Sequence, residues 1–318
     1  METVNILHMN PGDKESSYAR NSLLQETVLR KALPVLKRTI KGNTSRDLLS
    51  GQCFRIADLG CASGKNALLL ATNVMDIVIE ASVPGSFYCR LFSDQSLHLV
   101  HSSYSVHWLS QVPEGLESSA LNIYMAKTSP LNVFQSYQKQ FKTDFTKLLQ
   151  LRSEEIVSGG CMVLTLVGRS VADPTSDDGC LLWELLAQSL HDMVKEGLVR
   201  ESDINSFNVP IYYPCEDEVR NVIQNEGSFS LESLTTFQVN WDPRDTDYKN
   251  SNDSNGLSQT HAENTAKAVK AFTEPLLTSH FGKSIIDGLF KKYSKRVAQH
   301  LTNNKTRYFN LVISLAKK

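Results

Sequence analysis

The residues best suited to binding a charged ligand lie around one glycine turn. Asp58-Leu59-Gly60-Cys61-Ala62-Ser63-Gly64 follows a short apolar run and has the pattern D-x-G-x-x-x-G. Glycines let the backbone approach a ligand closely, and free N–H groups at the start of a following helix favour a carboxylate or phosphate. Asp58 suits an amino group or the cationic part of that ligand. Cys61 and Ala62 break the G-x-G-x-x-G pattern of dinucleotide sites, and a purely structural turn is the alternative interpretation.

Other chemically capable residues are less informative. His107 stands beside Trp108, and a histidine in that setting is more often a hydrogen-bonded core residue than a proton-transfer group. We therefore assign His107 no proton transfer. The six cysteines contain no CxxC pair, so neither a zinc site nor a disulfide framework is predicted, and we expect no catalytic metal.

The glycine turn requires a strand before it and a helix after it, and the hydrophobic pattern predicts both. Residues 53–60 read as a short buried strand, and the apolar run from residue 66 opens a helix. Strand, glycine turn and helix form the opening unit of a doubly wound α/β sheet. Gly159-Gly160 is expected to be the turn before one of three further strands, which are predicted at residues 96–102, 161–167 and 308–315.

Helical spacing dominates the rest of the chain. Amphipathic helices are predicted at residues 20–42, 133–157, 180–197, 216–225 and 262–300. The polar stretch 242–259 is predicted to be a mobile surface loop. The chain is interpreted as a single unit, 1–318, with an α/β core (45–170 and 300–318) and a mainly helical cap (1–44 and 171–299).

Charge and hydropathy limit the kinds of partner that the chain is expected to bind. The formal net charge is −1, which gives no reason to expect nucleic acid or an anionic membrane surface. No apolar run reaches the roughly 20 residues that span a bilayer. The first residues lack the basic start and apolar stretch of a signal peptide, so a cytoplasmic location is expected.

A series of short motifs, in order along almost the whole chain, resembles the plant SABATH methyltransferases. The motifs are His8-Met9-Asn10, residues 16–22 (SSYARNS), 57–64 (ADLGCASG), 83–88 (VPGSFY), 101–113 (HSSYSVHWLSQVP), 207–210 (FNVP), 226–229 (EGSF) and 280–282 (HFG). The resemblance implies a Rossmann-like S-adenosylmethionine-dependent methyltransferase core with a helical cap, commonly a homodimer. It also implies methyl esters of salicylate, benzoate, jasmonate or related acids as products, although one branch N-methylates xanthine alkaloids.

The resemblance assigns roles to residues that are otherwise unremarkable. Gln25 and Trp108 would donate hydrogen bonds to the substrate carboxylate, whereas without the family Gln25 reads as a solvated helix residue and Trp108 as core. A carboxylate is already ionised at neutral pH, so the reaction needs positioning rather than a general base. The implied pocket wall consists of Tyr104, His107, Leu166, Leu182, Trp183, Tyr212, Val269, Phe272 and Phe309.

The resemblance also implies a binding site for S-adenosylmethionine. Ser86 and Phe87 would face the adenine, and Asn66 the methionine moiety. Lys65 departs from the family, which usually has proline there, so the rigid helix start is lost. The implied cofactor residues are Tyr18, Asn21, Asp58, Gly60, Asn66, Ser86, Phe87 and Ser103.

A larger departure follows the first helix of the predicted sheet. The family has a second strand there that ends in Asn-Asp-Leu, whose Asp holds the ribose hydroxyls, but here residues 73–80 pass directly into 81–85. A unit of about 30 or more residues is missing, and Asp76 and Glu80 cannot replace that Asp by spacing. Three explanations for the missing unit are open: a shortened chain, a splice product, or a sequence restricted to ordered residues. We favour the last, because losing a central strand would expose two sheet edges and weaken cofactor binding.

The substrate class rests on a few positions. Gln25 favours a carboxylate over the xanthine branch, which tends to lack it. His107, where salicylate-preferring members often carry Met, favours benzoate-like or jasmonate-like acids, and Tyr104 narrows the pocket compared with jasmonate enzymes. Residues 271–275 (AFTEP) resemble the tea-type caffeine synthases, so xanthine N-methylation is the alternative. A non-catalytic small-acid-binding protein that has lost cofactor affinity is a third hypothesis.

Overall fold

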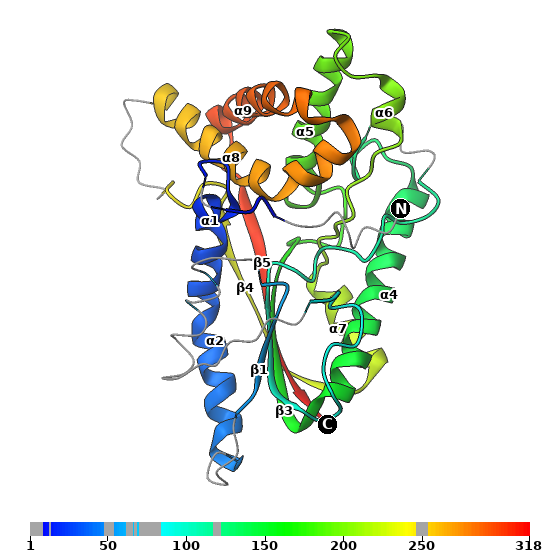
Figure 1. Ribbon diagram of the computed structural model, residues 1–318, viewed down its shortest axis with the longest axis vertical. Helices are drawn as coiled ribbons and strands as arrows, with labels where there is room; N and C mark the ends of the chain where they lie inside the picture. The colour runs from blue at the N-terminus through cyan, green and yellow to red at the C-terminus, as the bar shows by residue number, and fades with distance from the viewer. Residues whose placement is uncertain are drawn as a thin grey trace.

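A mixed five-stranded sheet, with helices on both faces and a helical layer over one end, forms the described part of the chain (Figure 1). The computed structural model describes residues 9–12, 14–47, 54–61, 66, 69, 84–116, 122–245 and 254–318. The strands, in their spatial order, are β1 (Ile56–Leu59), β2 (Leu97–Ser103), β3 (Ile156–Gly168), β5 (Arg307–Lys317) and β4 (Phe229–Asn240).

The first three strands in that order are parallel, and β5 is antiparallel to both of its neighbours. The carboxyl ends of β1, β2 and β3 therefore reach the same edge of the sheet. The register places Asp58 opposite His101 and Ser103 opposite Thr165 at that edge. Residues 160–168 of β3 are buried without interruption, as expected for a central strand that is covered on both faces.

Helices cover the two faces unequally. α2 (Leu23–Asp47) lies along one face, where Leu29 and Leu36 pack in one apolar cluster with Leu99 of β2. α4 (Leu131–Glu155) and α7 (Glu216–Glu226) lie on the opposite face (Figure 1). The apolar side of α4 is buried against the sheet, which is what its helical spacing predicts.

The helical layer lies over the carboxyl ends of the parallel strands (Figure 1). It contains α1 (Tyr18–Asn21), α5 (Asp177–Lys195), α6 (Glu201–Asn205), α8 (Ser254–Phe281), the short 3-10 helix η3 (Lys283–Ile285) and α9 (Ile286–Asn303). The backbone N–H of Asn10 donates to the carbonyl of Ala271 in α8 at 3.1 Å, so the N-terminal segment is held to this layer. No helix in the described part of the chain has the length and hydrophobicity needed to cross a bilayer.

The three further strands and most of the helices predicted from the sequence are confirmed, but Gly159-Gly160 lies in an irregular stretch within β3, where Gly159 has a φ of +74°, and not in a turn before the strand. α4 ends at Glu155 and β3 begins at the next residue, so both glycines lie within the strand. β4 was not predicted, because this strand is polar, largely half-exposed and paired only with β5. Its residues were assigned to the helical cap, although they complete the sheet.

Two boundaries in the second half of the chain also differ from the prediction. The single helix predicted at 262–300 is divided into α8 and α9 by Gly282, whose φ of +83° is the left-handed conformation that ends a helix. The loop predicted at 242–259 is wrong at both ends: Asp242 is buried and accepts a hydrogen bond from Asn264, and α8 already begins at Ser254.

Predictions about the segment after the glycine turn concern residues that lie mostly outside the described part of the chain. Asn66 and Leu69 are helical, in agreement with a helix there. Lys65, Asp76, Glu80 and the expected position of the missing unit all lie outside the described residues. Within the described residues, β1 forms the edge of the sheet.

Candidate active site

The glycine turn after β1 packs directly against the segment that follows β2. Gly60 has a φ of +70°, and a Cβ atom at this position would lie 2.3 Å from Ser105 Oγ. The Ser105 hydroxyl donates to the Gly60 carbonyl at 3.2 Å. A side chain at position 60 is therefore excluded by both backbone conformation and space, and the turn is held against residues 104–108.

Asp58 is held by a histidine that the sequence analysis had not singled out. Asp58 Oδ1 and His101 Nδ1 are 2.7 Å apart, and the histidine is 2% exposed against 23% for the aspartate. The pairing follows from the register, because the two residues are opposite each other on β1 and β2. His101 fixes one carboxylate oxygen, and the rest of the Asp58 carboxylate is partly exposed, so a ligand could reach it.

Several buried polar atoms near this edge of the sheet have no hydrogen-bond partner among the described residues. Along β2, Leu99 packs against α2, so His101 and Ser103 face the same side, and Thr165 is opposite Ser103 on β3. Buried polar atoms without partners are costly, and a polar ligand at this edge of the sheet would satisfy such a group. The unpartnered atoms are Ser17 Oγ, Gln25 Oε1, Asn66 Oδ1, His101 Nε2, Ser103 Oγ and Thr165 Oγ1.

The loop that carries Ser86 and Phe87 reaches the glycine turn. A Cβ atom on Gly60 would lie 3.5 Å from Phe87 Cε1, which shows how closely the ring approaches the turn. The Phe87 and Tyr88 rings are 4.6 Å apart, and the Tyr88 hydroxyl donates to the Trp108 carbonyl at 2.6 Å. The structure thus brings two of the sequence-predicted cofactor residues, Gly60 and Phe87, together.

The N-terminal cofactor candidates form their own small network. The backbone N–H of Tyr18 donates to the Asn10 carbonyl at 3.0 Å. Asn21 Nδ2 donates to the Glu15 and Ser17 carbonyls at 2.7 and 2.8 Å. Asn66 Nδ2 donates to the carbonyl of Ser22, just before α2, at 3.3 Å. These bonds place the start of α2 beside the helix that follows the glycine turn.

Four of the sequence-predicted wall residues and the predicted carboxylate donor Trp108 form an aromatic cluster between the sheet edge and the helical layer. Tyr104, His107 and Trp108 follow β2, whereas Trp183 lies in α5 and Phe272 in α8. The Phe272 ring is 6.1 Å from Trp108 and 6.5 Å from Trp183, both edge to face. Tyr104 and His107 are also edge to face, at 5.4 Å. Aromatic pairs in this arrangement suit the wall of a pocket for a flat, apolar ligand.

The remaining wall candidates have different surroundings. Leu166, Leu182 and Val269 are buried in the main core cluster, and Phe309 packs against it while partly buried.

The two proposed carboxylate donors are also largely buried. Gln25 of α2 is only 9% exposed, so it is not the solvated helix residue that its sequence pattern alone predicts. No hydrogen bond joins the Trp108 indole N–H to any described residue, while its backbone N–H donates to the Ser105 carbonyl at 3.0 Å.

Tyr213, which the sequence analysis missed, contacts the aromatic cluster more directly than its predicted neighbour. Its ring is 6.0 Å from His107, and its hydroxyl accepts a hydrogen bond from Trp183 Nε1 at 3.2 Å. Tyr212 instead stacks on Phe141 of α4 at 5.1 Å and donates its hydroxyl proton to Glu218 at 2.7 Å. Two adjacent tyrosines are indistinguishable in sequence, so no local signal could have separated them.

His107 is neutral in the folded protein. Burial lowers the pKa of its imidazole to about 3, and Nδ1 accepts a hydrogen bond from the backbone N–H of Val167 at 3.2 Å. An uncharged ring beside Trp108 does not add a cation to the pocket, and a group with this pKa is a poor proton acceptor at neutral pH.

Tyr104 is held in a strained conformation at the end of β2. Its φ is +60°, which is unusual for a residue with a side chain. Its backbone N–H donates to the Thr165 carbonyl at 2.8 Å, and its hydroxyl donates to Asn310 Oδ1 of β5 at 2.5 Å. Strain that is maintained by bonds at both ends of a residue is typical of functional sites.

Comparison with known families agrees with this geometry. The family model described as SAM dependent carboxyl methyltransferase matches residues 4–82 and 77–318. The chain belongs to this S-adenosylmethionine-dependent carboxyl methyltransferase family. The resemblance to the SABATH enzymes is thereby confirmed, and the methyltransferase uses S-adenosylmethionine as its methyl donor. The two matched segments meet where the sequence analysis placed a missing unit.

The similarity to named relatives covers the whole chain. The methyltransferase is 38% identical to the probable jasmonic acid carboxyl methyltransferase 1 of Theobroma cacao, over 385 aligned positions and 100% of both chains. It is 38% identical to the benzoic acid/salicylic acid carboxyl methyltransferase 3 of Petunia hybrida, over 100% of this chain and 99% of the relative. The cacao alignment is longer than the 318 residues of this chain, so the relative has residues without a counterpart here.

A solved structure confirms the fold class. Loganic acid methyltransferase with SAH superposes with a TM-score of 0.84 at 28% identity, covering 98% of this chain and 99% of that one. The α/β, Rossmann-like methyltransferase core with a helical cap that was predicted from the sequence is therefore correct. These comparisons favour neither the xanthine N-methyltransferase alternative nor a non-catalytic binding protein.

Proposed function

We propose that this methyltransferase converts a small, flat or hydrophobic acid of the benzoate, salicylate or jasmonate type into its methyl ester. The observation that carries the proposal is the aromatic cluster of Tyr104, His107, Trp108, Trp183 and Phe272, which is apolar, edge-to-face and contains a neutral histidine. The names of the cacao and petunia relatives support the same acids.

The proposed mechanism is one of positioning. S-adenosylmethionine supplies, when bound, a methyl group activated by its sulfonium. The acid is already ionised because a carboxyl pKa is about 4. Gln25 and Trp108 would orient the carboxylate through amide and indole N–H groups, which are neutral and do not compete as nucleophiles. Buried aromatic walls exclude water and strengthen these hydrogen bonds.

The orientation of Trp108 is supported by its backbone. Its N–H donates to Ser105, its carbonyl accepts from Tyr88, and the residue forms an isolated antiparallel bridge with Ile211. These contacts connect the proposed carboxylate donor to the glycine turn through Ser105 and to the 86–88 segment through Tyr88.

The proposed cofactor site is built around buried polar atoms that have no partner among the described residues. We assign Asn66 and Ser103 to the polar groups of the methionine moiety, because their side-chain oxygens are buried without partners among the described residues. Asp58 would bind the amino group, and Phe87 would face the adenine beside Gly60. Tyr18, Asn21 and Ser86 complete the site that the family resemblance implies.

The substrate class is tested by incubating the purified protein with labelled S-adenosylmethionine and benzoate, salicylate, jasmonate or theobromine. The expected products are methyl esters, which base hydrolyses to release the label. Base-stable N-methyl products alone would show that the carboxylate assignment is wrong. Absence of cofactor binding by calorimetry would favour a non-catalytic binding protein.

The assembly is proposed from the resemblance, and the location expected above is kept as a proposal. We infer a cytoplasmic homodimer that acts in plant secondary metabolism, and the plant sources of the relatives support the last point. Light scattering on the purified protein tests the dimer: the expected mass is twice that of one chain, and a monomer that retains full activity would exclude a need for dimerisation.

A further inference from the structure

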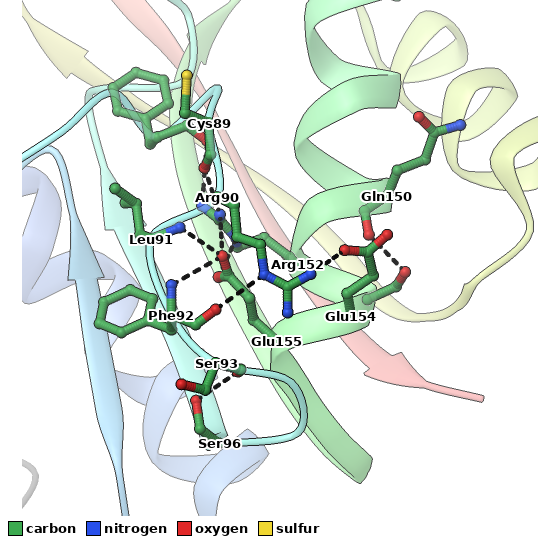
Figure 2. A network of polar contacts seen from close by, with 12 residues as sticks. Cys89, Arg90, Leu91, Phe92, Ser93, Ser96, Gln150, Arg152, Glu154 and Glu155 are labelled. Atoms are coloured by element: carbon green, nitrogen blue, oxygen red, sulfur yellow. Dashed lines mark hydrogen bonds and ion pairs between the residues drawn. The ribbon is translucent and has the colours of Figure 1, made fainter.

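A fully buried ion pair lies in the last turn of α4, outside the residues assigned to either substrate. Arg152 Nε and Glu155 Oε2 are 2.8 Å apart, and both side chains are 0% exposed. The two residues are three positions apart in the helix, so one face of α4 presents both charges to the same neighbour. Figure 2 shows them directed at the segment that precedes β2.

The pair binds the backbone of that segment, residues 84–96, which contains no helix or strand. Arg152 donates to the carbonyls of Phe87 and Cys89 at 3.2 and 2.9 Å. Glu155 Oε1 accepts from the backbone N–H groups of Leu91 and Phe92 at 2.8 and 3.1 Å (Figure 2). Four backbone groups of one loop are thus satisfied by two side chains.

Burial of this pair is unfavourable by itself. Each of the two charges loses its favourable interaction with water, and replacing such pairs by apolar residues is often neutral for stability. Burial lowers the pKa of the Arg152 guanidinium, which Glu155 opposes. The hydrogen bonds instead select one conformation of the loop, whose member Phe87 lies against the glycine turn at Gly60.

We propose that Arg152 and Glu155 are positioning residues for S-adenosylmethionine. They do not touch it; they hold Ser86 and Phe87 at the glycine turn, and so determine the affinity for the methyl donor. This inference rests on the proposed cofactor site, in which Phe87 faces the adenine. It requires that loss of the pair weakens binding of the donor and leaves binding of the acid largely unchanged.

The main test is the double variant R152M/E155L, in which no uncompensated buried charge remains. Calorimetry of the full chain, without the acid, is expected to show a Kd for S-adenosylmethionine about tenfold to hundredfold higher, because a released loop would populate the binding-competent conformation only about 1–10% of the time. The KM for the acid is expected to change by less than about threefold on the same grounds. An unchanged Kd, with or without a lower Tm, would overturn the proposal.

A second variant guards against failure of the double variant to fold. Arg152→Lys keeps a cation beside Glu155 but lacks the planar fork that serves two carbonyls and a carboxylate together. Its Kd for S-adenosylmethionine is expected to rise by a smaller factor, about three to tenfold. The matched control is Glu154→Gln, one position along the helix. It keeps the buried pair and loses only an ion pair to Arg90 of the same loop, whose two side chains are 41% and 54% exposed. Exposed ion pairs contribute little, so this variant should leave the loop in place.

Phe87→Ala separates this inference from the proposed cofactor site. If Phe87→Ala weakens donor binding and R152M/E155L does not, the cofactor site stands and the positioning role is wrong. If Phe87→Ala leaves the Kd unchanged, the adenine assignment fails and the positioning role fails with it. Weakening by both substitutions, with the Glu154→Gln control close to wild type, is the result that supports the inference.

Discussion

Two buried Arg–Glu pairs support the two sides of the active site, and they do so differently. Arg152 and Glu155 are neighbours in one helix and bind backbone groups of the 84–96 loop on the cofactor side. Arg169 and Glu218 are 2.9 Å apart but come from the end of β3 and from α7. Arg169 also donates to the Tyr213 carbonyl at 2.6 Å, on the substrate side.

The electrostatic settings of the two pairs also differ. Burial alone would raise the pKa of Glu218, but hydrogen bonds from Arg169, Gln138 and Tyr212 lower it overall. Around Arg152, burial is the dominant influence and lowers the guanidinium pKa. The substrate-side pair is therefore part of a wider polar network, whereas the cofactor-side pair serves one loop. Loss of the Arg169–Glu218 pair should affect both stability and the shape of the pocket. Loss of the Arg152–Glu155 pair should mainly affect the conformation of the 84–96 loop.

The largest effect is expected on the cofactor side, at Asp58. Asp58→Ala removes the carboxylate proposed to bind the amino group and leaves His101 without its partner. A hydrogen bond to a charged group contributes about 1.5–3 kcal/mol, so the Kd for S-adenosylmethionine should rise about 10- to 100-fold. Asp58→Asn keeps an acceptor for His101, so its Kd for S-adenosylmethionine should lie between those of the wild type and Asp58→Ala. Wild-type affinity of Asp58→Ala in calorimetry would remove Asp58 from the site.

On the substrate side, the corresponding change is Gln25→Ala. The variant loses one of the two proposed donors to the carboxylate, and the KM for the acid should rise about tenfold with little change in the KM for S-adenosylmethionine. Steady-state kinetics with each substrate varied in turn measures the split. Arg30→Gln, on the same helix but 56% exposed, is the control. Equal effects on both KM values would contradict the carboxylate role.

A smaller effect should distinguish the two adjacent tyrosines. Tyr213→Phe removes the acceptor of the Trp183 indole, and a loss of about 1 kcal/mol corresponds to about a fivefold higher KM for the acid. Tyr212→Phe breaks a bond to Glu218 and should lower Tm without a comparable change in that KM. If Tyr212→Phe had the larger kinetic effect, the pocket would be lined by Tyr212, as the sequence analysis predicted.

The smallest effect on activity is expected at His107. Its pKa is about 3 in the folded protein and about 6.5 when unfolded, so below pH 6.5 the unfolded state binds the additional proton. Stability from the neutral imidazole is complete above about pH 6.5 and is lost as the pH falls toward 3. Denaturant unfolding of His107→Gln should show a flatter pH dependence in that range. An unchanged slope would mean that His107 titrates normally in the folded state.

The sequence by itself determined the elements whose signals are local. The glycine turn after β1, the apolar run of β3 and the amphipathic spacing of α4 depend on residues close together in the chain, and all three are observed. The motifs were also sufficient to identify the family and the methyl donor. Local backbone preference and hydrophobic spacing need no knowledge of distant contacts.

Only the tertiary structure decided which polar residues share a site. β4 was missed because its partner β5 lies far along the chain and its own pattern is weak. Asp58 meets His101 through strand register, and Arg152 reads as a surface charge of a helix until the 84–96 loop is seen to cover it. Such pairings depend on contacts between segments separated by 43 to 65 residues. The sequence therefore predicts the type of reaction, whereas the contacts that hold the site residues in place depend on the fold.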